Sequence, residues 1–201
     1  MKHGLLRSAS APTSNILDSD ISCAFVAPIS VISNQPAYAQ DAMNLRRDAS
    51  SQGVQRWEIT TNLHPSNNGA ELLLHTAING TYKKFFATMP QVHGLAISAA
   101  SLYTSAPSAA GASVIPVTGA MTPGEFINFG IDPKVYLVTE STSTTVTILP
   151  PLLAAVPDVT NVRRGRNTYI RLRYDSDTQI GITYVDGILS DQGAVKLIEA
   201  L

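Results

Sequence analysis

The stretch GEFINFGIDPKVYLVTESTSTTVTILPPL, residues 124–152, decides the fold class of this chain. It contains short runs of β-branched and aromatic residues at 125–129, 134–140 and 144–149. Glycine, proline, aspartate and serine lie between these runs, where turns need special backbone angles. With a similar run at 113–118, they predict four short strands at about ten-residue spacing, an arrangement typical of a small β-barrel or sandwich.

Strands are also predicted on both sides of this stretch. Residues 55–61, QRWEITT, alternate so that Trp57, Ile59 and Thr61 share one face, which is the period of a half-buried strand. We therefore expect Trp57, the only tryptophan, to face a core. Further strands are predicted over residues 22–33 (one or two strands), 83–89, 168–174, 180–188 and, in preference to a short helix, 193–201.

One segment departs from the β pattern. Asn68 followed by Glu71 resembles a capping box, and apolar residues then recur at helical spacing up to Ile78. Gly80 stands where a helix C-cap glycine belongs. The sequence therefore predicts one amphipathic helix of about three turns within residues 66–79.

The expected fold class is mainly β. Residues 165–201 are too few to build a sheet-based domain alone, so they need strands from residues 21–100 as partners. We predict an outer β-sandwich or barrel-like domain, residues 21–100 plus 165–201, carrying the amphipathic helix. Residues 101–164 form a smaller inserted β-barrel domain, reached through flexible Ser/Ala-rich and Arg/Gly-rich linkers.

Residues 1–20 are rich in Ser, Ala and Asn and hold few bulky apolar groups. Such a terminus is poorly ordered unless a partner holds it. We predict an extended N-terminal arm over residues 1–20 that reaches a neighbouring molecule.

Composition favours a surface that other molecules cover. Hydrophobic residues make up 44% of the chain and charged residues only 14%, against about 25% charged in ordinary soluble domains. Burial in an assembly is one explanation, and a surface rich in Ser, Thr and Asn is the other. The net charge of −1 provides no attraction to nucleic acid or anionic lipid.

Membrane insertion and secretion are not expected. The chain has no apolar run long enough to cross a bilayer. The apolar segment 21–32 and the later Ala37-Tyr38-Ala39 imitate a signal peptide. However, Asp18 and Asp20 precede that segment where basic residues belong, and Pro28 interrupts it.

The search for catalytic chemistry finds no coherent set of residues. Cys23 is the single cysteine, so no intramolecular disulfide forms, and its apolar neighbours predict a small buried side chain. The histidines lack metal-ligand spacing and are expected in surface or capping roles: His3, His64, His75 and His93.

Two pairs of carboxylates lie close in sequence, Asp18 with Asp20 and Asp175 with Asp177, both in turn-like contexts. Either pair could contact a calcium ion, but solvated turn residues are far more common. The chain also has no nucleophile elbow and no phosphate-binding loop. We therefore predict no catalytic residue, no cofactor, no metal and no enzymatic activity.

Arg163, Arg164 and Arg166 form the only tight cluster of cations. One interpretation is an anion or nucleic-acid contact. The favoured one is a solvated inter-domain loop that pairs with acidic residues of a neighbouring subunit, because a nucleic-acid channel needs more cations than these.

The order of motifs resembles a group of tailed-bacteriophage distal tail and baseplate structural proteins, the adaptor-like subunits that ring the tail tube. The resemblance rests on GEFINFG at 124–130, KVYLV at 134–138, TVTILPPL at 145–152 and the ending IEAL at 198–201. It covers most of residues 55–201, and its motifs are structural rather than catalytic. It implies an outer β-domain with a smaller β-barrel inserted between two of its strands. Residues 1–20 do not match the group.

The expected function is a structural component of a phage tail or baseplate, assembled in the host cytoplasm and located in the virion. Its partners would be further copies in a homo-oligomeric ring, the tail-tube protein and other tail or baseplate proteins, held by strand addition and interface burial. No membrane or direct nucleic-acid partner is expected.

Two alternatives differ in class. A receptor- or carbohydrate-binding module of the tail tip would need aromatic residues exposed on loops, and Tyr38 and Tyr103 are the only candidates. An enzyme such as a cell-wall hydrolase is the third possibility, and the missing catalytic constellation counts against it.

Overall fold

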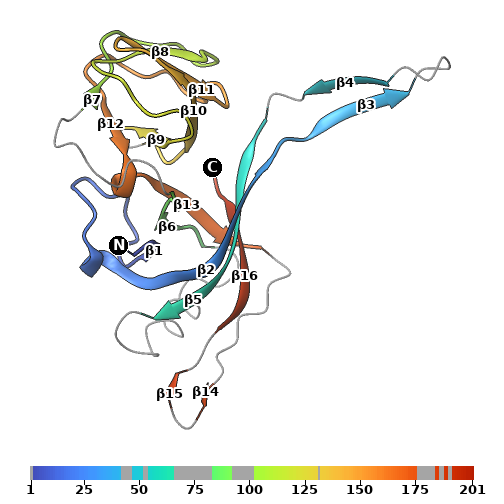
Figure 1. Cartoon of the computed structure of the whole chain (residues 1–201), viewed down its shortest axis with the longest axis vertical. Coiled ribbons are helices and arrows are strands. Elements are labelled where there is room, and N and C mark those ends of the chain that lie inside the picture. The colour runs from blue at the N-terminus through green and yellow to red at the C-terminus, as the bar shows by residue number, and fades with distance from the viewer. Residues whose placement is uncertain are drawn as a thin grey trace.

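The structure is a computed structural model that describes residues 2–41, 47–51, 54–65, 83–91, 102–130, 132–175, 184–185, 188–189 and 192–201. It is mainly β, as predicted, and consists of a closed barrel, a curled sheet and two small hairpins (Figure 1). Within the described residues the only helical segments are two 3-10 turns, Asp18–Asp20 and Gly165–Asn167. The helix predicted within 66–79 lies outside the described residues.

Six antiparallel strands close the barrel. In barrel order they are β1 (Gly4–Leu6), β2 (Ile21–Asn34), β5 (Arg56–Pro65), β16 (Gln192–Glu199), β13 (Tyr169–Tyr174) and β6 (Phe85–Thr88). Pairing of Leu5 with Ala87 joins the first strand to the last. The interior holds Trp57, Ile59 and Leu63 from β5, so the prediction that Trp57 faces a core is confirmed. Cys23 is fully buried in the same core, also as predicted.

A second, six-stranded sheet, called here the insert sheet, is formed entirely by residues 102–164. Its order is β7 (Leu102–Tyr103), β12 (Asn161–Arg164), β9 (Phe126–Phe129), β10 (Tyr136–Ser141), β11 (Thr145–Leu149) and β8 (Val114–Pro116). It curls until its edges meet at one bridge, between Thr104 and Val117. The four predicted strands are confirmed. The Ser/Ala-rich residues 98–113 are predicted to form a linker or loop, and this is wrong at Leu102–Tyr103, because this short segment pairs with β12.

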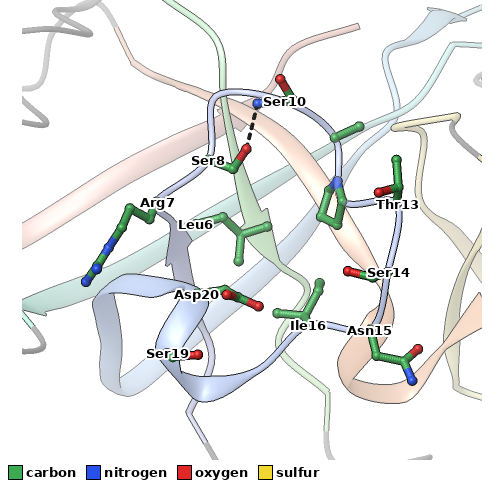
Figure 2. Close-up of a pocket in the computed structure, with 12 residues that line it drawn as sticks. Leu6, Arg7, Ser8, Ser10, Thr13, Ser14, Asn15, Ile16, Ser19 and Asp20 are labelled. Carbon is green, nitrogen blue, oxygen red and sulfur yellow. Dashed lines mark hydrogen bonds between the residues drawn. The ribbon is translucent and has the colours of Figure 1, made fainter.

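The predicted N-terminal arm, residues 1–20, differs from the structure. Gly4–Leu6 is a barrel strand between β2 and β6, and Leu5 and Leu6 are buried. The loop that follows closes on itself, because the Arg7 N–H donates to the Asp20 carbonyl at 2.8 Å. Ile16 anchors this loop in an apolar cluster with Leu6 (Figure 2). The segment therefore folds against its own barrel, because these few apolar side chains complete its core.

Two pairs of strands lie outside the barrel and the insert sheet. β3 (Ala37–Asp41) and β4 (Arg47–Ser51) continue β2 and β5 as a two-stranded ribbon, which projects away from the barrel in Figure 1. This ribbon is called the arm below. β14 (Tyr184–Val185) and β15 (Ile188–Leu189) pair with each other, and the other residues of the predicted strand 180–188 lie outside the described residues. The strand predicted at the C-terminus is confirmed as β16.

The role of β1 is testable with two leucines from the same N-terminal segment. Leu5 is 0% exposed and Leu17 is 58% exposed. We expect Leu5→Ala to lower the free energy of unfolding by about 3 kcal/mol, because it leaves a cavity where the barrel closes. Leu17→Ala should change it by less than about 0.5 kcal/mol. Urea denaturation measures both. Equal, small effects would mean that the segment is a detached arm after all.

Candidate functional site

The arm is the longer of the two isolated two-stranded ribbons in the described chain, and the other is the β14–β15 hairpin. Its strands pair in register from Ala37 with Ser51 to Asp41 with Arg47. No third strand pairs with β3 or β4 within the described residues. An isolated two-stranded ribbon is marginally stable in water, and both of its edges present unpaired N–H and C=O groups. These edges are available to strands of another molecule.

The free edge of the arm continues along β2. β1 pairs with β2 only near its start, at Ile21, Cys23 and Ala24. From Val26 to Asn34 the outer edge of β2 has no strand partner in the described part of the chain. Most of this stretch is solvent-exposed, including Val26 and Ile32. The unpaired edge therefore begins on the barrel and extends onto the arm.

On the outer face of the arm's root, one carboxylate joins three strands. Glu58 of β5 accepts hydrogen bonds from Asn34 Nδ2 of β2 at 2.8 Å and from Arg56 Nε at 3.0 Å. Lys196 Nζ of β16 lies 3.2 Å from the other carboxylate oxygen. The hydrogen bond from Asn34 lowers the pKa of Glu58, with help from Lys196 and Arg56 and against the effect of burial. Glu58 thus fixes β2 and β16 to β5 where the arm leaves the barrel.

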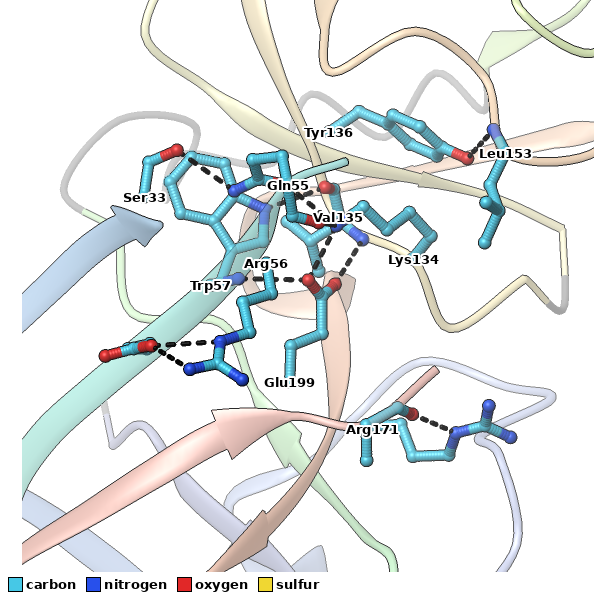
Figure 3. Close-up of polar contacts among 12 residues, drawn as sticks. Ser33, Gln55, Arg56, Trp57, Lys134, Val135, Tyr136, Leu153, Arg171 and Glu199 are labelled. Carbon is cyan, nitrogen blue, oxygen red and sulfur yellow. Dashed lines mark hydrogen bonds and ion pairs between the residues drawn. The ribbon is translucent and has the colours of Figure 1, made fainter. Parts of the chain in front are cut away.

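On the inner face, a buried ion pair lies beside Trp57 (Figure 3). Lys134 Nζ is 2.6 Å from Glu199 Oε2 and also donates to the carbonyl and side-chain oxygens of Gln55, at 2.9 and 2.8 Å. The backbone N–H of Trp57 donates to the same Glu199 oxygen at 3.0 Å. Both ionic side chains are buried. Burial raises the pKa of Glu199 and lowers the pKa of Lys134, and the attraction between the two charges opposes both shifts.

This ion pair docks the insert sheet onto the barrel, because Lys134 precedes β10 whereas Glu199 ends β16. The Trp57 indole N–H donates to the Val135 carbonyl at 2.9 Å, and its ring meets Phe126 edge-on at 5.1 Å between centroids. Val135 is part of the barrel core, so the insert sheet covers one end of the barrel. Two halves of the chain therefore meet in one apolar and ionic interface.

The segment that leads from the insert sheet back to the barrel, between β12 and β13, is also packed. Gln91 accepts a hydrogen bond from the Phe126 N–H at 3.0 Å and donates to the Gly165 carbonyl. Thr168 Oγ1 donates to the Phe126 carbonyl at 2.9 Å. The predicted flexible Arg/Gly linker is therefore wrong, because its residues bond to both units.

The arginine cluster is engaged within its own chain. Arg164 makes a two-bond pair with the fully buried Glu125, both contacts at 2.8 Å. Arg166 pairs with Asp18 at 2.9 Å. Arg163 donates to the carbonyls of Gly130 and Ser14 and lies over the Tyr169 ring. The prediction of a solvated loop is wrong, because Arg163 is buried and the other two arginines pair with acidic residues distant in sequence. Pairing with a neighbouring subunit stays a prediction.

The remaining sequence candidates do not converge. His64 is exposed, and burial lowers the pKa of His3, whereas His75 and His93 lie outside the described residues. Asp18 and Asp175 form ion pairs, and Asp20 accepts a hydrogen bond from the Leu17 N–H. Asp177 lies outside the described residues. Within the described residues, no group of three or more His, Cys, Asp or Glu is placed to hold a metal ion.

The N-terminal loop encloses an open hollow of about 630 Å³ (Figure 2). Hydroxyl-bearing residues such as Ser8, Thr13 and Ser19 line it, above the apolar side chains of Leu6 and Ile16. No histidine or cysteine is among the described residues that line it. This lining offers hydroxyl groups to polar groups of a partner or ligand.

No protein-family model matches the sequence, and no curated protein matches it significantly. No helix in the described ranges has the length and apolar character needed to span a membrane.

The Glu58 network predicts acid-sensitive stability. Because the pKa of Glu58 is lowered on folding from about 4.5, its contribution is present above that pH and is lost as the pH falls through the folded-state pKa. We expect Glu58→Gln to cost on the order of 1 kcal/mol at pH 7. The difference from wild type should shrink below about pH 4.5. Denaturation across pH measures it, with the exposed Glu140→Gln as control. A pH-independent difference would contradict this role.

The buried ion pair predicts strong coupling between its partners. Lys134→Met leaves a buried carboxylate without its cation and should cost roughly 3–5 kcal/mol. Adding Glu199→Gln removes that charge while still accepting the Trp57 N–H, so the double variant should be more stable than the sum of the single losses predicts. A double-mutant cycle by urea denaturation measures this coupling. Additive losses would show that the two side chains act independently.

Proposed function

We propose that this protein is a structural subunit of a tailed-bacteriophage tail or baseplate, working through protein–protein contact and not as an enzyme. The observation that carries the proposal is the arm, a two-stranded ribbon whose open edges continue onto β2. A strand edge of this kind is a template for pairing with another chain.

The root of the arm supports a mechanical role. Glu58 joins three strands on its outer face, and Trp57 with the Lys134–Glu199 pair holds its inner face. A ribbon anchored on both faces keeps its direction relative to the barrel. That property suits an element that must reach a neighbour at a defined place.

The motifs within residues 124–152 add the phage tail assignment, through their resemblance to distal tail and baseplate subunits. The low charged content fits a surface that neighbours cover. The finer architecture proposed is the one that this resemblance implies, with the insert sheet serving as the small inserted barrel of an outer β-domain.

The partners follow from this assignment. Copies of the chain assemble as a homo-oligomeric ring around the tail tube, in contact with the tail-tube protein and other baseplate proteins. Strand addition between arms of neighbouring copies supplies main-chain hydrogen bonds. The protein is assembled in the host cytoplasm and resides in the virion.

A receptor- or carbohydrate-binding module of the tail tip is the second candidate. The hydroxyl-lined hollow of the N-terminal loop and the partly exposed Tyr103 favour it. Binding of the purified protein to a glycan array would promote this candidate above the structural one.

Removal of the arm tests the structural role. We expect the full chain to form oligomers with masses that are multiples of 21.4 kDa. Replacing residues 37–51 by a short Gly/Ser turn should leave a folded monomer, because these residues pair only with each other within the described chain. Native mass spectrometry measures the masses, and thermal unfolding serves as the folding control. A full chain that is monomeric at every concentration would overturn the proposal, as would a shortened chain that assembles normally.

A further inference from the structure

Val159 has a backbone conformation that its side chain does not favour. Its φ of 51° lies in the left-handed region, which β-branched residues rarely adopt. Its neighbours impose this conformation. The Val159 N–H donates to the Thr104 carbonyl at 2.9 Å, and Thr104 Oγ1 donates to the Pro157 carbonyl at 2.7 Å. Glycine or asparagine would fit the same turn with less strain.

The Val159 side chain is 73% exposed, so it buries little apolar surface that could offset this backbone strain. Strained residues that persist at a surface point to a function for the side chain. Tyr103, beside Thr104 on β7, is also exposed, at 37%. Asp158 is exposed and forms no ion pair with the described residues. The hydrogen bond from Val159 to Thr104 shows that the exposed Tyr103 and Val159 come from neighbouring segments, and Asp158 adds a carboxylate next to Val159; these residues are called the knob below.

A cleft of about 470 Å³ lies at the root of the arm and has the complementary character. Pro36, Val54 and Leu201 contribute apolar lining, and Val54 is 55% exposed. Arg56 lies at the same cleft with much of its side chain in solvent, although it also contacts Glu58. The cleft therefore combines exposed apolar surface with the Arg56 guanidinium group, and Glu199, whose carboxylate is paired with Lys134, also lines it.

We propose that the knob of Tyr103 and Val159 on one copy of this chain inserts into the arm-root cleft of a second copy. This inference rests on the proposed assembly function. The apolar side chains of the knob match the lining at Val54, and the charge of Asp158 is opposite to that of Arg56. A preformed apolar pocket that accepts a patch from elsewhere on the molecule makes a head-to-tail contact.

The positions of the two surfaces agree with such a contact. In Figure 1, β7 lies on the side of the insert sheet that faces away from the arm, whereas the cleft residues lie at the arm's root. When the knob and the cleft lie on different sides of one molecule, repeated contacts generate a ring of copies if the rotation between neighbouring copies closes.

Substitution of the knob separates assembly from folding. Val159→Asn keeps a residue that tolerates the left-handed conformation but removes the apolar group. We expect an unfolding midpoint at or above that of wild type, with self-association weakened by about tenfold or more. Val114→Thr, at an exposed valine on β8, is the matched control and should leave association unchanged. Unchanged association of Val159→Asn would overturn the inference.

Disulfide trapping tests the contact directly. Native Cys23 is fully buried, so it does not compete with introduced thiols. Protein carrying Val159→Cys is mixed with protein carrying Val54→Cys under mild oxidation. We expect a covalent dimer containing one chain of each, because disulfides form only between closely placed side chains. The single-variant proteins incubated alone should not give this product.

The outcomes distinguish the two proposals. A chain that assembles, with neither trapping nor an effect of Val159→Asn, overturns the knob-and-cleft contact and leaves the assembly function standing. A chain that remains monomeric at every concentration and gives no trapped dimer overturns both.

Discussion

The whole structure depends on one constraint, which is that every strand edge must find hydrogen-bond partners. Backbone N–H and C=O groups left unpaired away from water are costly. The barrel meets this constraint by pairing Leu5 with Ala87, and the insert sheet meets it by curling until Thr104 reaches Val117. The arm and the outer edge of β2 meet it only through solvent or a partner. The described residues thus leave unpaired strand edges at the arm with β2 and at the short β14–β15 hairpin.

The barrel and the insert sheet are joined by a buried ion pair whose two charged groups both have partners. Lysine and glutamate are seldom fully buried unless they are paired. Lys134 and Glu199 pair with each other and with backbone groups at the junction, next to the apolar contact of Trp57 with Phe126. Such pairs add specificity of placement more than stability, because desolvation offsets much of their attraction. Here the ion pair specifies the position of the insert sheet over the barrel.

Strands were predictable where they are long enough to show alternation, as at Trp57, or rich enough in β-branched residues, as at 144–149. β1, β7 and β12 were missed because each holds at most one β-branched or aromatic residue, too few to indicate a strand. The candidate site was only partly predictable. Composition and resemblance predict an assembly role, with residues 1–20 as the segment that reaches a neighbour. In the structure, open strand edges belong instead to the arm at 37–51.

By itself, the sequence determined the β class, the burial of Trp57 and Cys23, and most strands of the insert sheet, because side-chain period and turn chemistry act over a few neighbouring residues. Only the tertiary structure decided which strands close the barrel and which charges pair. Glu125 meets Arg164, and Lys134 meets Glu199, across 39 and 65 residues of chain respectively. No local pattern encodes such distances. They follow from the packing of two sheets that bring remote side chains to one surface.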